Sequence, residues 1–240
     1  MERLDKIIAT GGGISRSDAR KAVLKGQVTV NANTVRDIAY KVDPKADLIT
    51  LNGNQINYKK YVYLVINKPC GVLTATEDKR QKTVLDLVPN ELYRKDLFPV
   101  GRLDKNTTGL LILTNDGDFG HTLLSPNYKV PKKYLVTLDG EIGDGLVDEF
   151  KAGLTLADGT KLSPAGLEIL QPKNKALVTI TEGKYHQIKR MFGLFELGVD
   201  ALERVSFAGL NLPKDLSYGQ VRELTAAELD IVNNAKNTIK

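Results

Sequence analysis

VGRLDKNTTGLLILT, residues 100–114, places an arginine and a carboxylate between two glycines and directly ahead of an aliphatic run. The run at 110–114 predicts a buried strand. In the extended segment before it, residues two positions apart point to the same face, so Arg102 and Asp104 should project together. The stretch therefore predicts a fixed carboxylate with a mobile cation beside it.

Composition around this stretch allows one large domain or two smaller ones. The chain has 240 residues, of which 42% are hydrophobic, so it can bury a substantial core. Its formal net charge is +5. Residues 1–59 contain 10 Lys/Arg against 6 Asp/Glu, whereas the remainder is nearly balanced. This distribution indicates a basic docking module for a polyanion, joined to a larger domain.

Several chemistries lack their usual residues. Cys70 is the only cysteine, which excludes an intrachain disulfide and disfavours a cysteine-based zinc site. Neither His121 nor His186 has a partner at metal-ligand spacing, and no phosphate-binding glycine motif or serine-nucleophile motif is present. What remains is a metal-free, carboxylate-centred site. The sequence has no signal-peptide pattern and no apolar run of about 20 residues, so we expect a cytoplasmic protein that does not enter membranes.

The basic first quarter has the pattern of two short helices followed by short strands. Apolar spacing predicts a helix that ends at Gly11–Gly13, and Ser15 or Ser17 can cap a second helix. One side of the second helix is basic, through Arg16, Arg20, Lys21 and Lys25. An ordinary solvated face is the alternative interpretation of these four cations. Short strands are expected at 28–30, 34–35 and 48–51.

The larger part is expected to begin at residue 60 and to have an α+β fold with a mostly antiparallel sheet. Its elements do not alternate as regular β-α units. The expected strands lie at 61–66, 110–114, 134–138 and 176–181. The expected helices lie near 116–124, 144–152, 187–197 and 225–236.

Three clusters in this part combine glycine or proline with cations beside an apolar strand: 68–72, 101–104 and 182–191. Each alone has an unremarkable interpretation. Asp104 could be a turn or cap carboxylate, Lys189 an exposed helix cation, and Lys68 a lysine whose stem is covered at a strand end.

Residues 1–50 resemble the S4-type RNA-binding module. The resemblance rests on Arg3-Leu4-Asp5-Lys6, on the run from Ser15 to Arg20 and on the run from Gly26 to Asn31. It implies that the second helix, with Arg16, Arg20 and Lys21, grips the RNA backbone. Lysine and arginine contacts to phosphate give such binding a strong salt dependence and little sequence preference.

The three clusters, in this order and behind this module, resemble the pseudouridine synthases that act on ribosomal RNA, in particular the small-subunit type. The matching segments are Lys68-Pro69 with Gly71-Val72, Gly101-Arg102-Leu103-Asp104 with Thr107 and Gly109-Leu110, Lys133-Tyr134, Glu182-Gly183-Lys184 with 187–191, and Leu202 with Arg204. This family converts uridine to its C-glycoside isomer without a cofactor.

The resemblance also implies residue roles. It makes Asp104 the catalytic carboxylate, which detaches the base by attack at the anomeric carbon or by assisting proton loss from the sugar. Lys189 matches the family position of the basic residue that pairs with this carboxylate. Related branches often have arginine at this position. Tyr134 matches the aromatic ring against the target base, and Arg102 the residue that fills the stack when the uridine is flipped out. Lys68 and Arg190 are expected to bind RNA or to act as structural props.

We therefore expect a small S4-like domain over residues 1–59 and a catalytic domain over 60–240 that isomerises a specific uridine, most simply in small-subunit 16S rRNA. The expected partner is ribosomal RNA or a pre-ribosomal subunit, with the enzyme a monomer and no metal or cofactor. Three alternatives stay open: a synthase for large-subunit 23S rRNA, a non-catalytic ribosome-assembly protein, and a hydrolase that releases free uracil.

Overall fold

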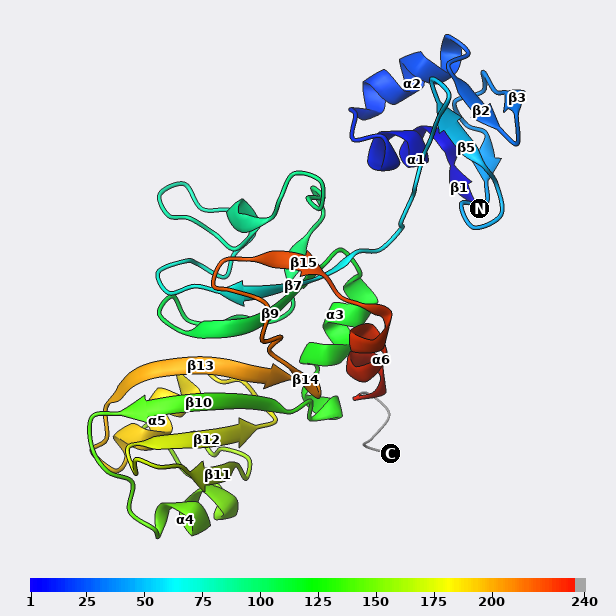
Figure 1. The fold of residues 1–240 in the computed structure, drawn as a ribbon. Coiled ribbons are helices and arrows are strands. Elements are labelled where there is room, and N and C mark those ends of the chain that lie inside the picture. Colours follow the sequence, from blue (N-terminus) through cyan, green and yellow to red (C-terminus); the bar gives the residue numbers. More distant parts are fainter. Residues whose placement is uncertain (236–240) are drawn as a thin grey trace. The chain divides into compact units, whose positions relative to one another are not determined.

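The chain divides into two compact units in the computed structural model, which describes residues 1–235 (Figure 1). The first unit spans Met1–Tyr61 and the second begins at Val62. None of the helices within residues 1–235 has the length and apolar character that crossing a bilayer requires. The division into an RNA-binding domain over residues 1–59 and a catalytic domain over residues 60–240 stays a prediction.

The first unit packs two helices on small antiparallel sheets. Leu4, Ile7 and Ile8 of the first helix and Ala19 and Val23 of the second are fully buried in its core. The elements are α1 (Leu4–Gly11), α2 (Arg16–Leu24), a sheet of order β3 (Asn33–Thr34), β2 (Val28–Val30), β5 (Ile49–Leu51) and β6 (Asn54–Gln55), and the pair β1 (Glu2–Arg3) and β4 (Lys41–Val42). The Ser15 hydroxyl accepts a hydrogen bond from the Asp18 backbone N–H at 3.1 Å, as expected of a helix cap.

The second unit is built on one large mixed sheet, which confirms the α+β prediction. Its main path runs β11-β12-β10-β13-β9-β7-β15, and every pairing is antiparallel except β9 with β13. The strands are β7 (Tyr63–Lys68), β8 (Phe98–Pro99), β9 (Thr108–Thr114), β10 (Lys132–Leu138), β11 (Gly166–Ile169), β12 (Lys175–Ile180), β13 (Val199–Phe207), β14 (Leu210–Asn211) and β15 (Val221–Glu223).

The helices of this unit are α3 (Gly117–Leu124), α4 (Leu146–Ala152), α5 (Gln187–Gly193) and α6 (Ala226–Asn234), with short 3-10 turns at Leu85–Leu87 and Pro126–Tyr128. All four α-helices were predicted. However, α5 ends at Gly193 and not near residue 197 as the sequence pattern indicated.

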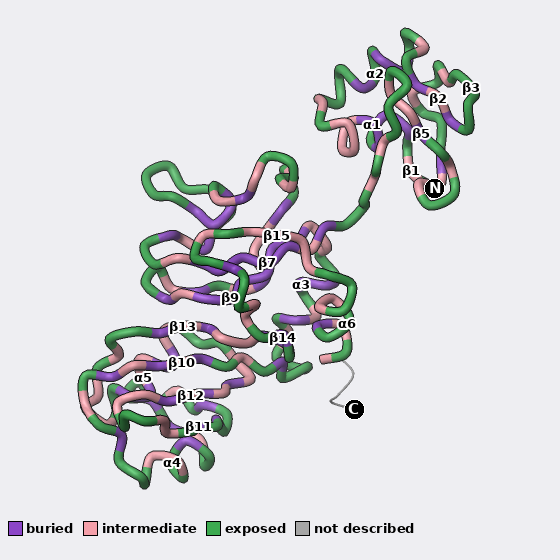
Figure 2. Tube along the Cα trace, in the orientation of Figure 1, coloured by how far each residue is buried: buried purple, intermediate pink, exposed green. Residues whose placement is uncertain are grey.

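The continuous apolar run after Asp104 is explained by burial on both faces of β9. Leu111 and Leu113 belong to one core cluster, whereas Leu110 and Ile112 belong to another. Successive strand residues point to opposite faces, so a strand covered on both sides needs apolar residues at every position. Figure 2 shows β7 and β9 as largely buried strands.

The longest strand, β13, was not predicted, because charges interrupt its apolar pattern. Arg204 is nevertheless 1% exposed, and its Nε donates to the Leu110 carbonyl at 2.7 Å. Its guanidinium carbon also lies 4.7 Å from the centre of the Phe207 ring. Gly109 has φ +100°, and a Cβ there would lie 2.4 Å from the Arg204 carbonyl oxygen. This glycine therefore permits the close parallel pairing of β9 with β13, which fixes the strand that follows Asp104.

Candidate active site

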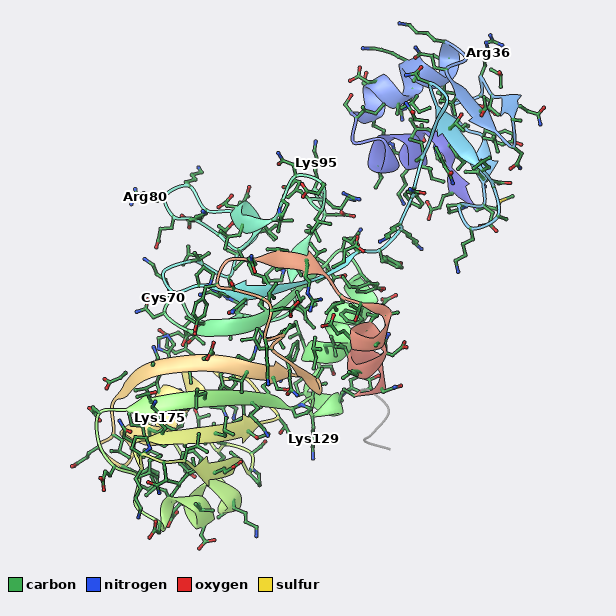
Figure 3. All side chains as sticks on the ribbon, viewed as in Figure 1. Arg36, Cys70, Arg80, Lys95, Lys129 and Lys175 are labelled. Carbon is green, nitrogen blue, oxygen red and sulfur yellow. The ribbon has the colours of Figure 1, made fainter. Side chains whose placement is uncertain are left out.

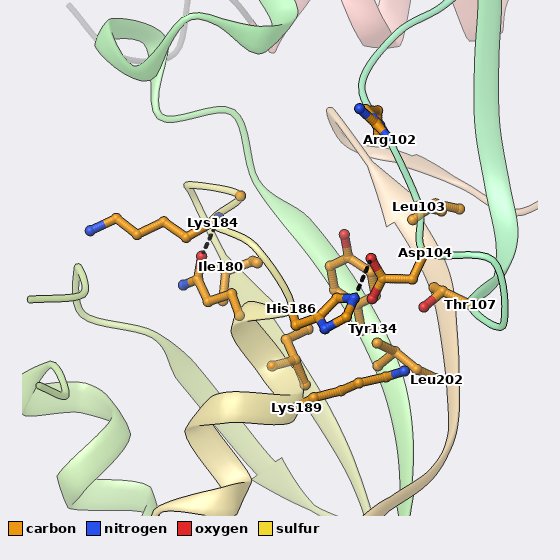
Figure 4. Close-up of a pocket in the computed structure, with 13 residues that line it drawn as sticks. Arg102, Leu103, Asp104, Thr107, Tyr134, Ile180, Lys184, His186, Lys189 and Leu202 are labelled. Atoms are coloured by element: carbon orange, nitrogen blue, oxygen red, sulfur yellow. Dashed lines mark hydrogen bonds and ion pairs between the residues drawn. The ribbon is translucent and has the colours of Figure 1, made fainter. Parts of the chain in front are cut away.

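One pocket of the second unit is lined by residues from all the chain segments that bear the candidate catalytic residues (Figure 4). Arg102, Leu103, Asp104 and Thr107 come from the loop before β9, Tyr134 from β10, Ile180 from β12 and Leu202 from β13. The rest of the lining comes from the loop and first turns of α5: Gly183, Lys184, His186, Gln187, Ile188 and Lys189.

The loop that bears Asp104 is held by a buried lysine. The Lys68 ammonium donates to the carbonyl oxygens of Pro69, Lys105 and Thr107 at 3.1, 3.0 and 2.9 Å. The Thr107 N–H also bonds to the Asp104 carbonyl at 3.0 Å and closes a turn. Burial lowers the pKa of Lys68 to about 8. The Lys68 side chain is fully buried and its observed bonds go to the loop backbone, which favours the interpretation of this lysine as a structural prop. Contact of Lys68 with RNA stays a prediction.

The Asp104 carboxylate is accessible from the pocket. Its side chain is 33% exposed, and its Oδ1 lies 3.6 Å from His186 Nε2. Lys189 lines the same pocket. Among the described residues, however, the basic group within ion-pair distance of Asp104 is His186 and not Lys189. No sequence pattern assigns a role to His186, although the residue lies inside the third charged cluster.

Tyr134 and Leu202 form part of the apolar wall. Tyr134 is 7% exposed, and in β10 it pairs with Val178 of β12 and Arg204 of β13. A tyrosine fixed between two neighbouring strands cannot move far. Its ring therefore gives the pocket a rigid aromatic surface, close to the carboxylate in Figure 4.

Side-chain hydrogen bonds hold the loop that precedes α5. Glu182 Oε1 accepts from the Ser163 backbone N–H at 2.9 Å and from Gln187 Nε2 at 3.1 Å. Gln187 Oε1 in turn accepts from the Lys184 backbone N–H at 2.9 Å. The loop is thus bonded both to itself and to the segment around Ser163, so His186 and Lys189 enter the pocket from a fixed support.

Two predicted cations of the second unit have different surroundings. Arg102 is exposed and lines the pocket. Arg190 lies outside the pocket lining and forms an ion pair with Asp158. Hydrogen bonds from Thr160 and then Arg190 lower the pKa of Asp158 to about 2. Arg190 therefore has a structural partner, whereas loop cations such as Arg80 and Lys95 extend outward from the unit (Figure 3).

The arginines of the first unit converge on a buried carboxylate. The Asp5 side chain has no exposed surface. Its carboxylate accepts hydrogen bonds from the Nε atoms of Arg3 and Arg20, each at 3.0 Å, and its Oδ1 lies 3.7 Å from a terminal guanidinium nitrogen of Arg16. Burial raises the pKa of Asp5, but the arginine contacts outweigh burial and lower it to about 2. The Arg16 and Arg20 side chains remain about half exposed. Lys21 pairs with Asp18 at 3.3 Å and is also exposed.

The described residues contain no group of three His, Cys, Asp or Glu side chains placed to hold a metal ion. The pocket offers one accessible carboxylate, an imidazole, the ammonium groups of Lys184 and Lys189, the Arg102 guanidinium and an aromatic wall. Such a set can orient a planar, uncharged base beside an acid–base or nucleophilic oxygen.

Comparisons with known proteins agree with this arrangement. Residues 62–193 match the RNA pseudouridylate synthase family, and residues 2–57 match the S4 domain. A crystal structure of a pseudouridylate synthase superposes with a TM-score of 0.67 at 31% identity, covering 97% of this chain and 100% of that one.

Curated relatives match over nearly their full lengths. An uncharacterized RNA pseudouridine synthase of Bacillus subtilis, YtzG, is 42% identical over 96% of this chain and 98% of its own. Ribosomal small subunit pseudouridine synthase A of Escherichia coli is 38% identical over 95% and 98%. Ribosomal large subunit pseudouridine synthase B of Bacillus subtilis is 37% identical over 95% and 94%. The chain, with an S4 domain followed by this catalytic fold, thus belongs to the RNA pseudouridylate synthase family.

Proposed function

We propose that this enzyme converts one specific uridine of small-subunit ribosomal RNA to pseudouridine, with Asp104 as its catalytic carboxylate. The observation that carries the proposal is the accessible Asp104 side chain in a pocket that Tyr134 and Lys189 also line. Asp104 is the one carboxylate among the described residues of that lining.

The reaction needs no co-reactant, because atoms and electrons balance within the nucleotide. The bond between N1 and the anomeric carbon breaks, and a bond between C5 and the same carbon forms. C5 loses a proton and N1 gains one. Asp104 assists the first step, either by attack at the anomeric carbon or by promoting proton loss from the sugar. The walls of the pocket retain the detached uracil while it turns.

The other proposed roles follow from what each side chain can do. Tyr134 supports the flat face of the flipped uracil, and Lys189 supplies a positive charge in the same lining as the Asp104 carboxylate. Exposed Arg102 fills the space that the everted base leaves in the RNA stack. In the S4 domain, the exposed parts of Arg16, Arg20 and Lys21 contact phosphates.

The small-subunit assignment is supported by the 38% identity to the Escherichia coli enzyme, which is named for that substrate. The large-subunit enzyme of Bacillus subtilis is 37% identical, so 23S rRNA is the alternative substrate. We further propose that the enzyme works as a cytoplasmic monomer on ribosomal RNA or on an assembling subunit.

The substrate is tested by incubating the full chain with 16S rRNA, 23S rRNA and isolated small-subunit particles, followed by mapping of pseudouridine by mass spectrometry. The proposal expects one new pseudouridine in small-subunit RNA. It also expects that cells lacking the gene lack pseudouridine at the same position.

The other outcomes separate the alternatives. Modification of 23S rRNA alone would reassign the substrate to the large subunit. Free uracil in the supernatant would indicate glycosidic hydrolysis. RNA binding without product from any of the three substrates would indicate an assembly protein that has lost its chemistry.

A further inference from the structure

An exposed aromatic pair lies next to the pocket. The rings of Tyr185 and His186 stack, with centroids 3.9 Å apart and planes 20° from parallel. His186 lines the pocket and contacts Asp104, whereas Tyr185 lies outside the lining and is 76% exposed. The stacked pair therefore extends from the Asp104 carboxylate to open solvent.

The pair is held in an unusual backbone conformation. His186 has φ +47° and ψ +35°, in the left-handed region that residues other than glycine seldom adopt. Such a conformation persists only where the surrounding contacts impose it. Here the Glu182 and Gln187 hydrogen bonds described above fix the chain on both sides of the pair. Tyr185 is thus presented on a rigid loop.

The charges around the pair favour a nucleic-acid strand as its ligand. The pocket lining contributes the cations Arg102 and Lys189, and also Lys184, whose ammonium lies 3.8 Å from Glu182, against the single carboxylate of Asp104 within the described residues. The RNA phosphates would contact these cations while a base stacks on the exposed Tyr185 ring. Aromatic side chains on which bases stack, beside cations that follow the backbone, are the common composition of surfaces for unpaired nucleic acid.

We propose that Tyr185, supported from beneath by His186, is a stacking platform for an unpaired RNA base next to the everted uridine. The inference rests on the proposed function, because it requires a nucleotide in the pocket at Asp104. Everting one uridine breaks its stacking on both neighbours. A flat ring at the mouth of the pocket replaces one of those lost contacts and holds the flanking nucleotide in place. The platform accepts any base, since every base has a flat π surface.

The test uses the full chain and an RNA fragment that contains the mapped uridine, with the fluorescent base 2-aminopurine at each flanking position in turn. The fluorescence of 2-aminopurine is quenched when the base stacks. For the Tyr185→Ala variant we expect RNA affinity to fall about 5- to 150-fold and the quenching at one flanking position to disappear. Tyr185→Phe keeps the flat ring and should stay within about twofold of the parent affinity.

A matched control is Tyr128→Ala, because Tyr128 is also exposed (39%) but does not line the pocket. It should bind RNA as the parent does. Thermal melting of each variant excludes a folding defect as the cause of weaker binding.

Parent-like affinity and quenching in Tyr185→Ala would overturn the platform. So would a fall in the reaction rate with both binding measurements unchanged, because stacking must act through binding. These results differ from failure of the proposed function, in which the parent enzyme itself forms no pseudouridine.

Discussion

Asp5 in the first unit and Asp104 in the second are both aspartates close to arginine and lysine, but the fold treats them in opposite ways. Asp5 is fully buried and lies within ion-pair distance of three guanidinium groups. Asp104 is one-third exposed, and its one ion-pair contact within the described part of the chain is a 3.6 Å approach to His186. The first carboxylate is saturated by its partners, whereas the second keeps oxygen lone pairs available to a ligand.

The difference shows how a protein rich in cations can hold one carboxylate in its core and leave another accessible to a ligand. At Asp5 the aspartate holds arginines whose side chains remain about half exposed. In the loop that bears Asp104, the buried Lys68 ammonium donates to backbone carbonyls, so it fixes the loop without forming an ion pair with the carboxylate. Burial and partner count distinguish a structural carboxylate from one that is free to react.

Outside Asp104 itself, the largest expected effect is at Lys189. Lys189→Met should lower the single-turnover rate about 100-fold, because it removes a positive charge from the pocket that holds the Asp104 carboxylate. Lys189→Arg should stay within about tenfold of the parent rate. A parent-like rate for the methionine variant would show that Lys189 does not support Asp104.

The next effect concerns stability. Asp5→Asn should destabilise the first unit by about 2–3 kcal/mol, because charge-assisted bonds from Arg3 and Arg20 are weakened in a buried setting. Hydrogen exchange of α1 peptides in the full chain measures this. The control Asp18→Asn loses an exposed pair with Lys21 and should cost within about 1 kcal/mol. Equal protection of α1 in Asp5→Asn and the parent would contradict the structural role of Asp5.

A smaller effect is expected on RNA affinity. Replacing Arg16 and Arg20 by glutamine should weaken binding about tenfold and make the salt dependence of log K shallower by about 1–2, because up to two phosphate contacts are lost. Filter-binding titrations at several salt concentrations test this, with Lys45→Gln as an exposed control in the same unit. An unchanged salt slope would remove these arginines from the RNA interface.

A further effect is a pH dependence. The pKa of Asp5 falls from 3.8 to about 2 in the folded chain, which corresponds to about 2 kcal/mol. Because the folded pKa is depressed, this stabilisation is complete above about pH 4 and is lost as the pH falls toward 2. The protection of α1 in the parent should therefore decline in that interval relative to Asp5→Asn. A constant difference between the two proteins from pH 5 to 2 would contradict the assignment.

Regular patterns in the sequence were sufficient to predict most of the fold. The run 110–114, the cap at Ser15 and the glycines after α1 act locally, so local reasoning found them. β13 was missed because Arg204 is buried through a long-range bond to the Leu110 carbonyl. No local pattern reveals such a partner.

The same distinction applies to the candidate site. The sequence indicated Asp104, Tyr134 and Lys189, and the structure brings all three to one pocket. It did not indicate that Lys68 is buried, since the carbonyls that bind it lie 37 and 39 residues away at Lys105 and Thr107. His186 reaches Asp104 from a left-handed loop residue that no periodicity predicts.

The central claim is that Asp104 is the reactive carboxylate, and the most direct measurement is pseudouridine formation by Asp104→Asn beside RNA affinity and thermal stability of the same protein. The substitution keeps size and shape, removes the charge and replaces one carboxylate oxygen with an NH2 group. We expect no detectable product, affinity within about tenfold of the parent, or about 1.4 kcal/mol, and an unchanged melting temperature. Product formation at the parent rate would contradict the account.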